Sequence, residues 1–227
     1  QLNVDESVAT SIADGVLLGA NNGAALSLVK TGKGTLTMGT NSTWNGGLTI
    51  KEGKVAAQLA VSSADTLFGS AGGIGAASNV IYIEESGTLS VRGLNKDGRA
   101  LAGTEIVQQV LGTGTIEFAT GGSAFFSAQS KSFDGTVRLT ENTRIYLGSN
   151  LDYNGSGVGK NTLQSVQNAT IEVTSGSQVR LTSSLFGNRS THENIYADFV
   201  ISGSGFAGKT GSSDISKLDR LTSGALA

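Results

Sequence analysis

The chain has 227 residues and a formal net charge of −2, and its lysines and arginines are scattered singly, which excludes a basic patch for nucleic acid or anionic lipid. Cysteine and proline are absent while glycine occurs 33 times, so disulfides, thiolate zinc sites and collagen are excluded. No apolar run is long enough to span a bilayer, so we expect no membrane insertion. Many glycines without proline predict many tight turns between short strands.

Residues 1–27 hold two short apolar runs, separated by the turn signals Asp14-Gly15 and Asn21-Asn22-Gly23. We expect them to form an incomplete coil at one end of a repeat array. Because no signal peptide precedes them, we expect the chain to be an excised piece of a longer protein.

Three short strand patterns, separated by glycines, follow within residues 28–57. They lie at Thr35–Met38, Leu48–Ile50 and Val55–Ala57. Strands this short cannot bury enough apolar surface alone, so they need similar strands stacked above and below them.

Pairs of short strand patterns recur through the rest of the chain. They are Val80–Ile83 with Thr88–Val91, Glu105–Val110 with Thr115–Phe118, Thr136–Leu139 with Arg144–Leu147, Thr170–Val173 with Gln178–Leu181, and lastly Asp198–Ser202. Apolar and charged residues alternate in them, as where Ile116 and Phe118 flank Glu117, which places the apolar set inward. Helical periodicity is limited to Asp214–Leu221. The chain is therefore predicted to be all-β.

Three all-β arrangements compete: a sandwich, an antiparallel barrel and a parallel β-helix. A phrase of glycine, threonine and alternating apolar residues recurs as GKGTLTM at 32–38 and GTGTIEF at 112–118, and in shorter form as SGTLSV, DGTVRL and NATIEV. Equivalent coils of a solenoid begin alike because they stack in register. The phrase therefore favours one domain over residues 1–227, a single-stranded parallel β-helix of roughly eight or nine coils with loop insertions.

Residues 28–57 also carry a longer motif. Its residues are Lys30, Gly32, Gly34, Thr35, Leu36, the Gly39–Asn41 pairing, the aromatic Trp44, Gly46 or Gly47, Thr49, Ile50 and Gly53. This motif resembles the passenger-associated repeat of Gram-negative autotransporters, in which the aromatic is usually Tyr. The rest of the chain shares only the strand-and-turn style of that repeat.

The resemblance implies a passenger domain, a right-handed parallel β-helix that a C-terminal barrel exports across the outer membrane. The chain is then a passenger fragment at the bacterial cell surface or secreted, without the signal peptide and the translocator barrel. Passenger functions include adhesion, autoaggregation, proteolysis and esterase activity, and the fold does not decide among them. We expect a non-enzymatic adhesive or self-associating segment, with roles in virulence and biofilm. Its expected partners are a host receptor protein or glycan, a second copy of itself, and its own barrel.

One stretch matches a phosphate-binding loop pattern through Gly203, Gly208, Lys209 and Thr210. A phosphate loop needs a helix that begins at the Lys-Thr pair, so that amides and helix dipole converge on the phosphate. The Gly211–Ser213 stretch that follows is a poor first helical turn. We interpret the match as a false positive and expect no cofactor.

Nucleophilic and metal sites are not predicted. A Ser-His-Asp triad would need His192, which is the only histidine, and no serine lies in a nucleophile motif. The stretch AGGIGAAS at 71–78 approaches a calcium-binding repeat but lacks its Asp. We therefore predict no catalytic residue and no metal ligand.

Paired carboxylates are the remaining route to chemistry. They support the alternative of a carbohydrate-active β-helix enzyme, such as a polysaccharide lyase or hydrolase or a tailspike-like protein. That alternative requires three or more acids to converge in one groove, for example among Asp134, Glu141, Glu117 and Glu172.

Longer insertions between strands are the expected place for binding, because loops on a rigid stack tolerate variation. The insertions are Arg92–Gly103, Gly148–Thr162 and Phe186–Ala197. The candidate interaction residues are Asp152, Tyr153, Arg189, His192 and Tyr196. A further alternative is a structural spacer or folding-nucleus segment of a larger passenger.

Overall fold

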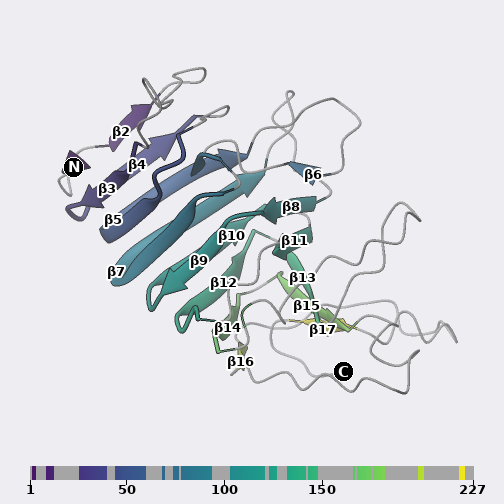
Figure 1. The fold of residues 1–227 in the computed structure, drawn as a ribbon. Helices are drawn as coiled ribbons and strands as arrows, with labels where there is room; N and C mark the ends of the chain where they lie inside the picture. Colours follow the sequence, from purple (N-terminus) through teal and green to yellow (C-terminus); the bar gives the residue numbers. More distant parts are fainter. Residues whose placement is uncertain are drawn as a thin grey trace, which may run out of the picture.

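A computed structural model of the chain consists mainly of β-strands and connecting loops (Figure 1), and among the described residues only Ile74 and Val166 have 3₁₀-helical conformation. The described residues are 2–3, 9–12, 26–39, 44–59, 68–69, 74–76, 78–93, 103–120, 123–126, 132–141, 143–147, 166, 168–174, 176–181, 199–201 and 220–222. The all-β prediction is confirmed.

The strands form two sheets that lie side by side along the molecule (Figure 1). The larger has eleven strands, β1 (Leu2–Asn3), β2 (Ala9–Ile12), β3 (Leu28–Thr31), β4 (Thr35–Met38), β5 (Leu48–Leu59), β7 (Val80–Gly93), β9 (Gln109–Gly112), β10 (Thr115–Ala119), β12 (Thr136–Thr140), β14 (Thr170–Val173) and β16 (Phe199–Ile201). The smaller has six strands, β6 (Phe68–Gly69), β8 (Gly103–Ile106), β11 (Ser123–Phe126), β13 (Arg144–Leu147), β15 (Gln178–Leu181) and β17 (Arg220–Thr222).

The chain alternates between the two sheets as it advances. From β10 onward each even-numbered strand lies in the larger sheet and each odd-numbered one in the smaller sheet, and the order within each sheet follows the sequence. The pairings between described strands are parallel, except that of β15 with β17. Within the stretch 214–221, the only one with helical periodicity in the sequence, Arg220 and Leu221 belong to β17, and residues 214–219 lie outside the described residues.

The recurring phrase of the sequence lines up in register across the larger sheet. Its threonines pair across β7, β10, β12 and β14 at Thr88, Thr115, Thr136 and Thr170. The residues that follow these threonines are fully buried and pair in the same way at Leu89, Ile116, Val137 and Ile171. Equivalent positions of the phrase therefore stack above one another, with similar apolar side chains inward.

The glycine before the threonine of β7, β10 and β12 is required by close backbone contact with the neighbouring strand, whereas Ala169 precedes the threonine of β14. At Gly135 an added Cβ would lie 2.1 Å from the carbonyl oxygen of Gly114, and at Gly114 one would lie 2.6 Å from that of Gly87. The same oxygen of Gly114 accepts a hydrogen bond from the Thr136 amide at 2.9 Å. The ladder thus brings the carbonyl of one glycine against the α-carbon of the next, and only hydrogen fits there.

Two predicted strand pairs are wrong, because each pair forms one long strand. Leu48–Ile50 and Val55–Ala57 both belong to β5, and Val80–Ile83 and Thr88–Val91 both belong to β7. In β5 the direction changes at Gly53, whose φ of 72° is readily adopted only by glycine, and the pairing register with β7 shifts between Ile50 and Glu52. The corner therefore bends the strand without ending it.

The opposite error occurs at Glu105–Val110, which was predicted as one strand. The structure divides it into β8 and β9 at Val107 and Gln108. The buried Gln108 amide donates hydrogen bonds to the carbonyl oxygens of Gly75, at 3.1 Å, and Ala76, at 3.3 Å. The chain leaves the smaller sheet at this point and enters the larger one.

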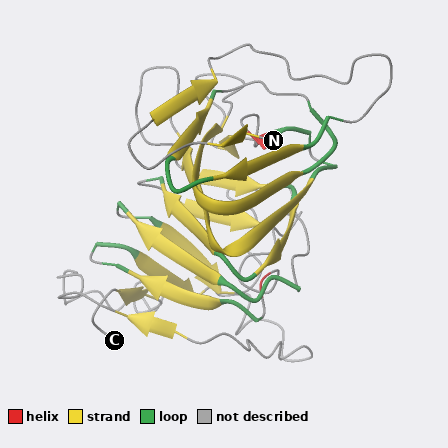
Figure 2. Cartoon of the chain, turned by 90° about the vertical axis from the view of Figure 1, so that its left-hand side faces the viewer, coloured by secondary structure: helices red, strands yellow, loops and turns green. Residues whose placement is uncertain are grey.

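One apolar core lies between the two sheets. Its buried residues extend from Leu36 on β4 to Val173 on β14 and include Phe126 on β11 of the smaller sheet. Phe118 on β10 meets Phe126 edge to face, with ring centroids 5.3 Å apart. Nearly all of the described chain is strand or connecting loop around this core (Figure 2).

Candidate functional site

A groove of about 350 Å³ crosses the outward face of the larger sheet. It lies within the range of about 300–1,000 Å³ that is typical of small-molecule sites. It runs across the adjoining strands β4, β5, β7 and β10 to the turn after β12, and its lining residues are Thr37, Lys54, Ala56, Ala57, Ser90, Arg92, Glu117, Ala119 and Glu141.

The groove exists because small residues occupy adjacent outward positions. Ala56 on β5 pairs with Ser90 on β7, and Ser90 pairs with Glu117 on β10. Paired positions on neighbouring strands are about 4.8 Å apart, so two short side chains in succession leave a depression between the longer ones around them.

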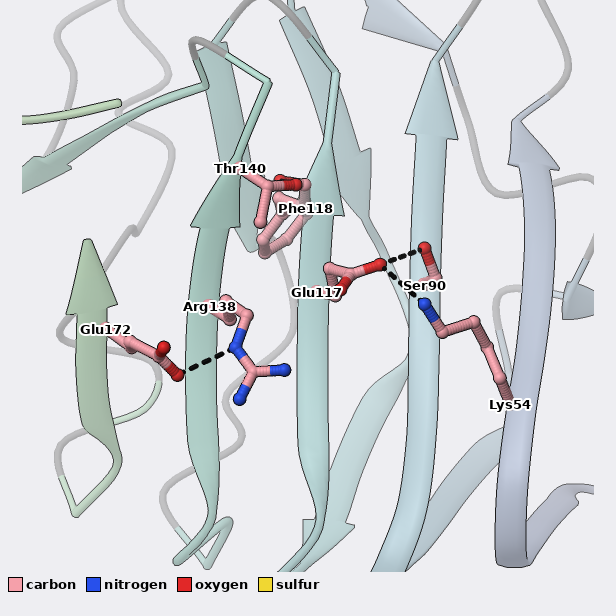
Figure 3. A network of polar contacts seen from close by, with 7 residues as sticks. All are labelled: Lys54, Ser90, Glu117, Phe118, Arg138, Thr140 and Glu172. Atoms are coloured by element: carbon pink, nitrogen blue, oxygen red, sulfur yellow. Dashed lines mark hydrogen bonds and ion pairs between the residues drawn. The ribbon is translucent and has the colours of Figure 1, made fainter. Parts of the chain in front are cut away.

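A charged pair spans the middle of the groove. Lys54 Nζ lies 3.1 Å from Glu117 Oε1, and the Ser90 hydroxyl donates a hydrogen bond to the same oxygen at 2.7 Å (Figure 3). Lys54 and Glu117 come from β5 and β10, with β7 between them, so both side chains reach over the short Ser90. Burial raises the pKa of Glu117, but the hydrogen bonds from Ser90 and Lys54 and the charges of Lys54 and Arg138 outweigh it and hold the pKa below its ordinary value. Glu117 is therefore a carboxylate at neutral pH.

A second, looser charged pair lies at one end of the groove. Arg92 lies near the end of β7, and its guanidinium lies 3.5 Å from Glu141 Oε2. Both side chains are about half exposed. The short Ala119 lies in the groove lining between these strands. An exposed pair at this distance contributes about 0–1 kcal/mol. It can therefore open towards a ligand at little cost.

The enzyme alternative requires three or more acids in one groove, and the structure brings together two of the four that were named for it. Glu117 and Glu141 line the groove. Glu172 lies farther along the sheet on β14, where it accepts a hydrogen bond from Arg138 Nε at 2.7 Å (Figure 3). Asp134 is exposed in the turn before β12, where its amide donates to the carbonyl of Gly112.

The predicted loop residues lie outside the part of the chain that the structure describes. They are Asp152, Tyr153, Arg189, His192 and Tyr196, and the phosphate-pattern residues Gly203, Gly208, Lys209 and Thr210 lie outside it as well. Within the predicted calcium-like stretch, Gly75 is packed against Trp44 and Asn79.

The sequence analysis missed the residues that shape the groove. Lys54, Ala56 and Ser90 stand in outward positions of their strands, and none of them was singled out as a candidate. Aligning the phrases would have placed Ala56, Ser90 and Glu117 in one row. Where short side chains and a long one stand at paired outward positions on neighbouring strands, the pattern predicts a depression in the face of the sheet.

Neither a metal centre nor a membrane helix is found within the described ranges. No group of three or more His, Asp or Glu side chains there is placed to hold a metal ion. No helix among those residues has the length and apolar character to cross a membrane. Comparison of the chain with protein-family models, with curated proteins and with solved structures finds no match in any of the three.

Proposed function

We propose that this chain is a surface-exposed segment of an exported bacterial protein of the autotransporter passenger type, and that it acts by binding. In this proposal the two parallel sheets are faces of one right-handed β-helix, and the segment adheres to a host or abiotic surface or to a second copy of itself. The observation that carries the proposal is the stacking of the recurring phrase in register across β7, β10, β12 and β14 of the larger sheet.

The alternation of the chain between two sheets supports the β-helical part of the proposal. In a solenoid each turn contributes one strand to each face, so the strand order within a face follows the sequence. Both sheets have this order. The passenger assignment depends on the repeat motif of residues 28–57, which includes the buried Lys30 and Trp44.

The charge state of Glu117 argues against one catalytic role on the outward face, that of a general acid. The groove on this face holds paired charges, and Glu117 has a pKa below its ordinary value. A general acid in glycoside hydrolysis needs a raised pKa, so that it carries a proton near neutral pH. Glu117 is therefore suited to accept hydrogen bonds from a ligand.

A display experiment tests the function. The parent protein is displayed on bacteria with residues 1–227 intact, deleted, or replaced by an unrelated β-helical rod of similar length. Loss of clumping or adhesion in both altered strains, with surface export intact, supports a binding role for this segment. The replacement keeps the distance from the membrane, so retained clumping or adhesion in that strain alone would identify a spacer.

Unchanged adhesion and clumping in both altered strains would contradict the binding proposal. The active part would then lie elsewhere in the parent protein. An intact export signal in every strain is the control, because failed export also abolishes adhesion.

A further inference from the structure

The charges in the groove cancel each other. Lys54 is paired with Glu117, and Arg92 is paired with Glu141, so the lining residues carry no net charge. A charged ligand would have to break one of these pairs and would leave its partner unpaired. The groove therefore favours a neutral ligand.

The groove also combines many polar groups with a short apolar floor. Ala56 and Ala119 present methyl groups, while the Ser90 and Thr37 side chains add hydroxyls, and the Ala57 side chain points into the core. Glu117 receives its contacts from Lys54 and Ser90 on Oε1, which leaves Oε2 as an acceptor. Guanidinium, ammonium, carboxylate and hydroxyl groups around small methyl groups match a ligand with hydroxyls at its edges and C–H groups on its face.

Backbone strain at the groove is a second, independent observation. Glu141 has a φ of 51° and is the one non-glycine residue with positive φ among those that the structure describes. The left-handed conformation costs an L-residue about 1–2 kcal/mol, and glycine or asparagine is usual there. Strain of this kind concentrates at binding and catalytic sites. Here it places a carboxylate at the end of the groove.

We propose that the groove binds a neutral oligosaccharide across the strands of the larger sheet. The groove extends from Thr37 on β4 to Glu141 after β12, which is four strand spacings or about 19 Å. That length exceeds a single sugar ring and suits a short chain. Glu117, Arg92 and Glu141 exchange hydrogen bonds with the sugar hydroxyls, and the alanine floor contacts a ring face. The inference names the ligand class for the binding role proposed above and depends on that role.

The test uses the purified 227-residue chain and an array of immobilised oligosaccharides. The array contains neutral chains of hexoses and N-acetylhexosamines beside sulfated and uronate-containing chains. The affinity for each oligosaccharide that binds is then measured by calorimetry. We expect neutral chains to bind, with an affinity that changes by less than roughly two-fold when salt is raised, because the ligand carries no charge to be screened.

Three variants locate the site. Ala56→Leu fills the groove without removing a charge, and Glu117→Gln removes the central negative charge and replaces one carboxylate oxygen with an NH₂ group. Each is expected to weaken binding by about ten-fold or more. Glu172→Gln is the matched control, because it breaks the ion pair with Arg138 on the same face outside the groove lining, and its affinity should equal that of the unmodified chain.

A fourth variant tests the strained residue. Glu141→Gly relieves the left-handed strain, so we expect a higher denaturation midpoint together with weaker sugar binding. A higher midpoint with unchanged affinity would remove Glu141 from the site.

Several results would overturn the inference. They are the absence of binding to every neutral chain, preference for the charged chains with steep salt dependence, and equal loss of affinity in Glu172→Gln and Ala56→Leu. Release of reducing ends from a bound chain would indicate an enzyme instead. The binding measurement uses the purified chain and no displayed cells, so the two proposals can fail separately. Sugar binding without adhesion contradicts only the proposed function. Adhesion without sugar binding contradicts only the proposed oligosaccharide site in the groove.

Discussion

At the scale of single residues, position in the stack decides what a charged side chain does. Lys30 stands in an inward position beside Ile50, and it is fully buried. Its ammonium donates to the carbonyl oxygens of Thr31, Gly32 and Glu52, which uses its three donors. Burial lowers the pKa of Lys30, and the charge of Glu52 opposes that shift. Lys30 therefore fastens the corner between β3 and β4, whereas the outward Lys54 lines the groove.

The lowered pKa of Glu117 makes stability depend on pH. The folded-state pKa is below the value of about 4.3 in an unfolded chain, so Glu117 stabilises the fold above that pH and loses this contribution as pH falls through the folded-state pKa. We expect Glu117→Gln to lower the free energy of unfolding by about 1–2 kcal/mol at neutral pH. The difference between variant and unmodified chain should vanish in acid.

Urea unfolding at about pH 7 and about pH 3 measures this dependence. The acid sample needs its own fold check by circular dichroism, because other carboxylates titrate in the same range. An equal difference between the two proteins at both pH values would show that the charge of Glu117 contributes nothing to stability.

Trp44, the aromatic residue of the repeat motif, lies deep in the core. It is fully buried, and its indole Nε1 has no hydrogen-bond partner among the described residues. We expect Trp44→Gly to cost at least about 3–5 kcal/mol, through lost burial and a cavity.

Trp44→Phe is the informative companion variant. It keeps an aromatic ring and removes the unpaired N–H, so we expect it to cost only about 1 kcal/mol. Both values come from urea denaturation followed by circular dichroism. A melting temperature of Trp44→Gly equal to that of the unmodified chain would contradict the buried position.

At the scale of the strands, the glycine column sets how closely β7, β10 and β12 approach. A methyl group at Gly135 would overlap the backbone oxygen of Gly114, and backbone cannot give way as a side chain can. We expect Gly135→Ala to lower the free energy of unfolding by about 2–3 kcal/mol, measured by denaturant titration.

The next strand supplies the control for this prediction. β14 carries Ala169 at the position before its threonine, so an alanine is accommodated there. Ala169→Gly should therefore cost only about 1 kcal/mol, from chain entropy and one lost methyl group. Equal costs at the two positions would show that close backbone contact does not explain the column.

At the scale of the whole molecule, one core joins strands that are distant in sequence. The buried cluster includes both Trp44 and Ile171. Since the chain has one tryptophan, its fluorescence reports unfolding near Trp44, while circular dichroism reports all strands. We expect both signals to change at one urea midpoint, as in a two-state transition.

Destabilising the far end of the core makes that expectation sharper. Ile171→Ala should cost about 3 kcal/mol and should shift the tryptophan midpoint as much as the circular dichroism midpoint. A shift in circular dichroism alone would mean that neighbouring strands unfold independently, as in long repeat arrays.

The sequence by itself determined the strand class and the inward set of side chains. Alternation with period two depends only on neighbouring residues, so Ile116, Val137 and Ile171 could be assigned to the core directly. The Gly-Thr phrase also predicted which residues stack, because parallel strands in register place equal positions together. Whether the corners at Gly53 and Gly87 end a strand was not predictable, since the backbone can bend there without losing its neighbours.

Only the tertiary structure decided where the groove lies. The groove needs Ala56 and Ser90 beside each other on adjacent strands, with Lys54 reaching Glu117, which is 63 residues away in sequence. It also needs the ion pair between Arg92 on β7 and Glu141 after β12, which reaches across β10. Local patterns determine the direction of each side chain, but the pairing register between strands determines its neighbours, and that register is set by packing across the whole sheet.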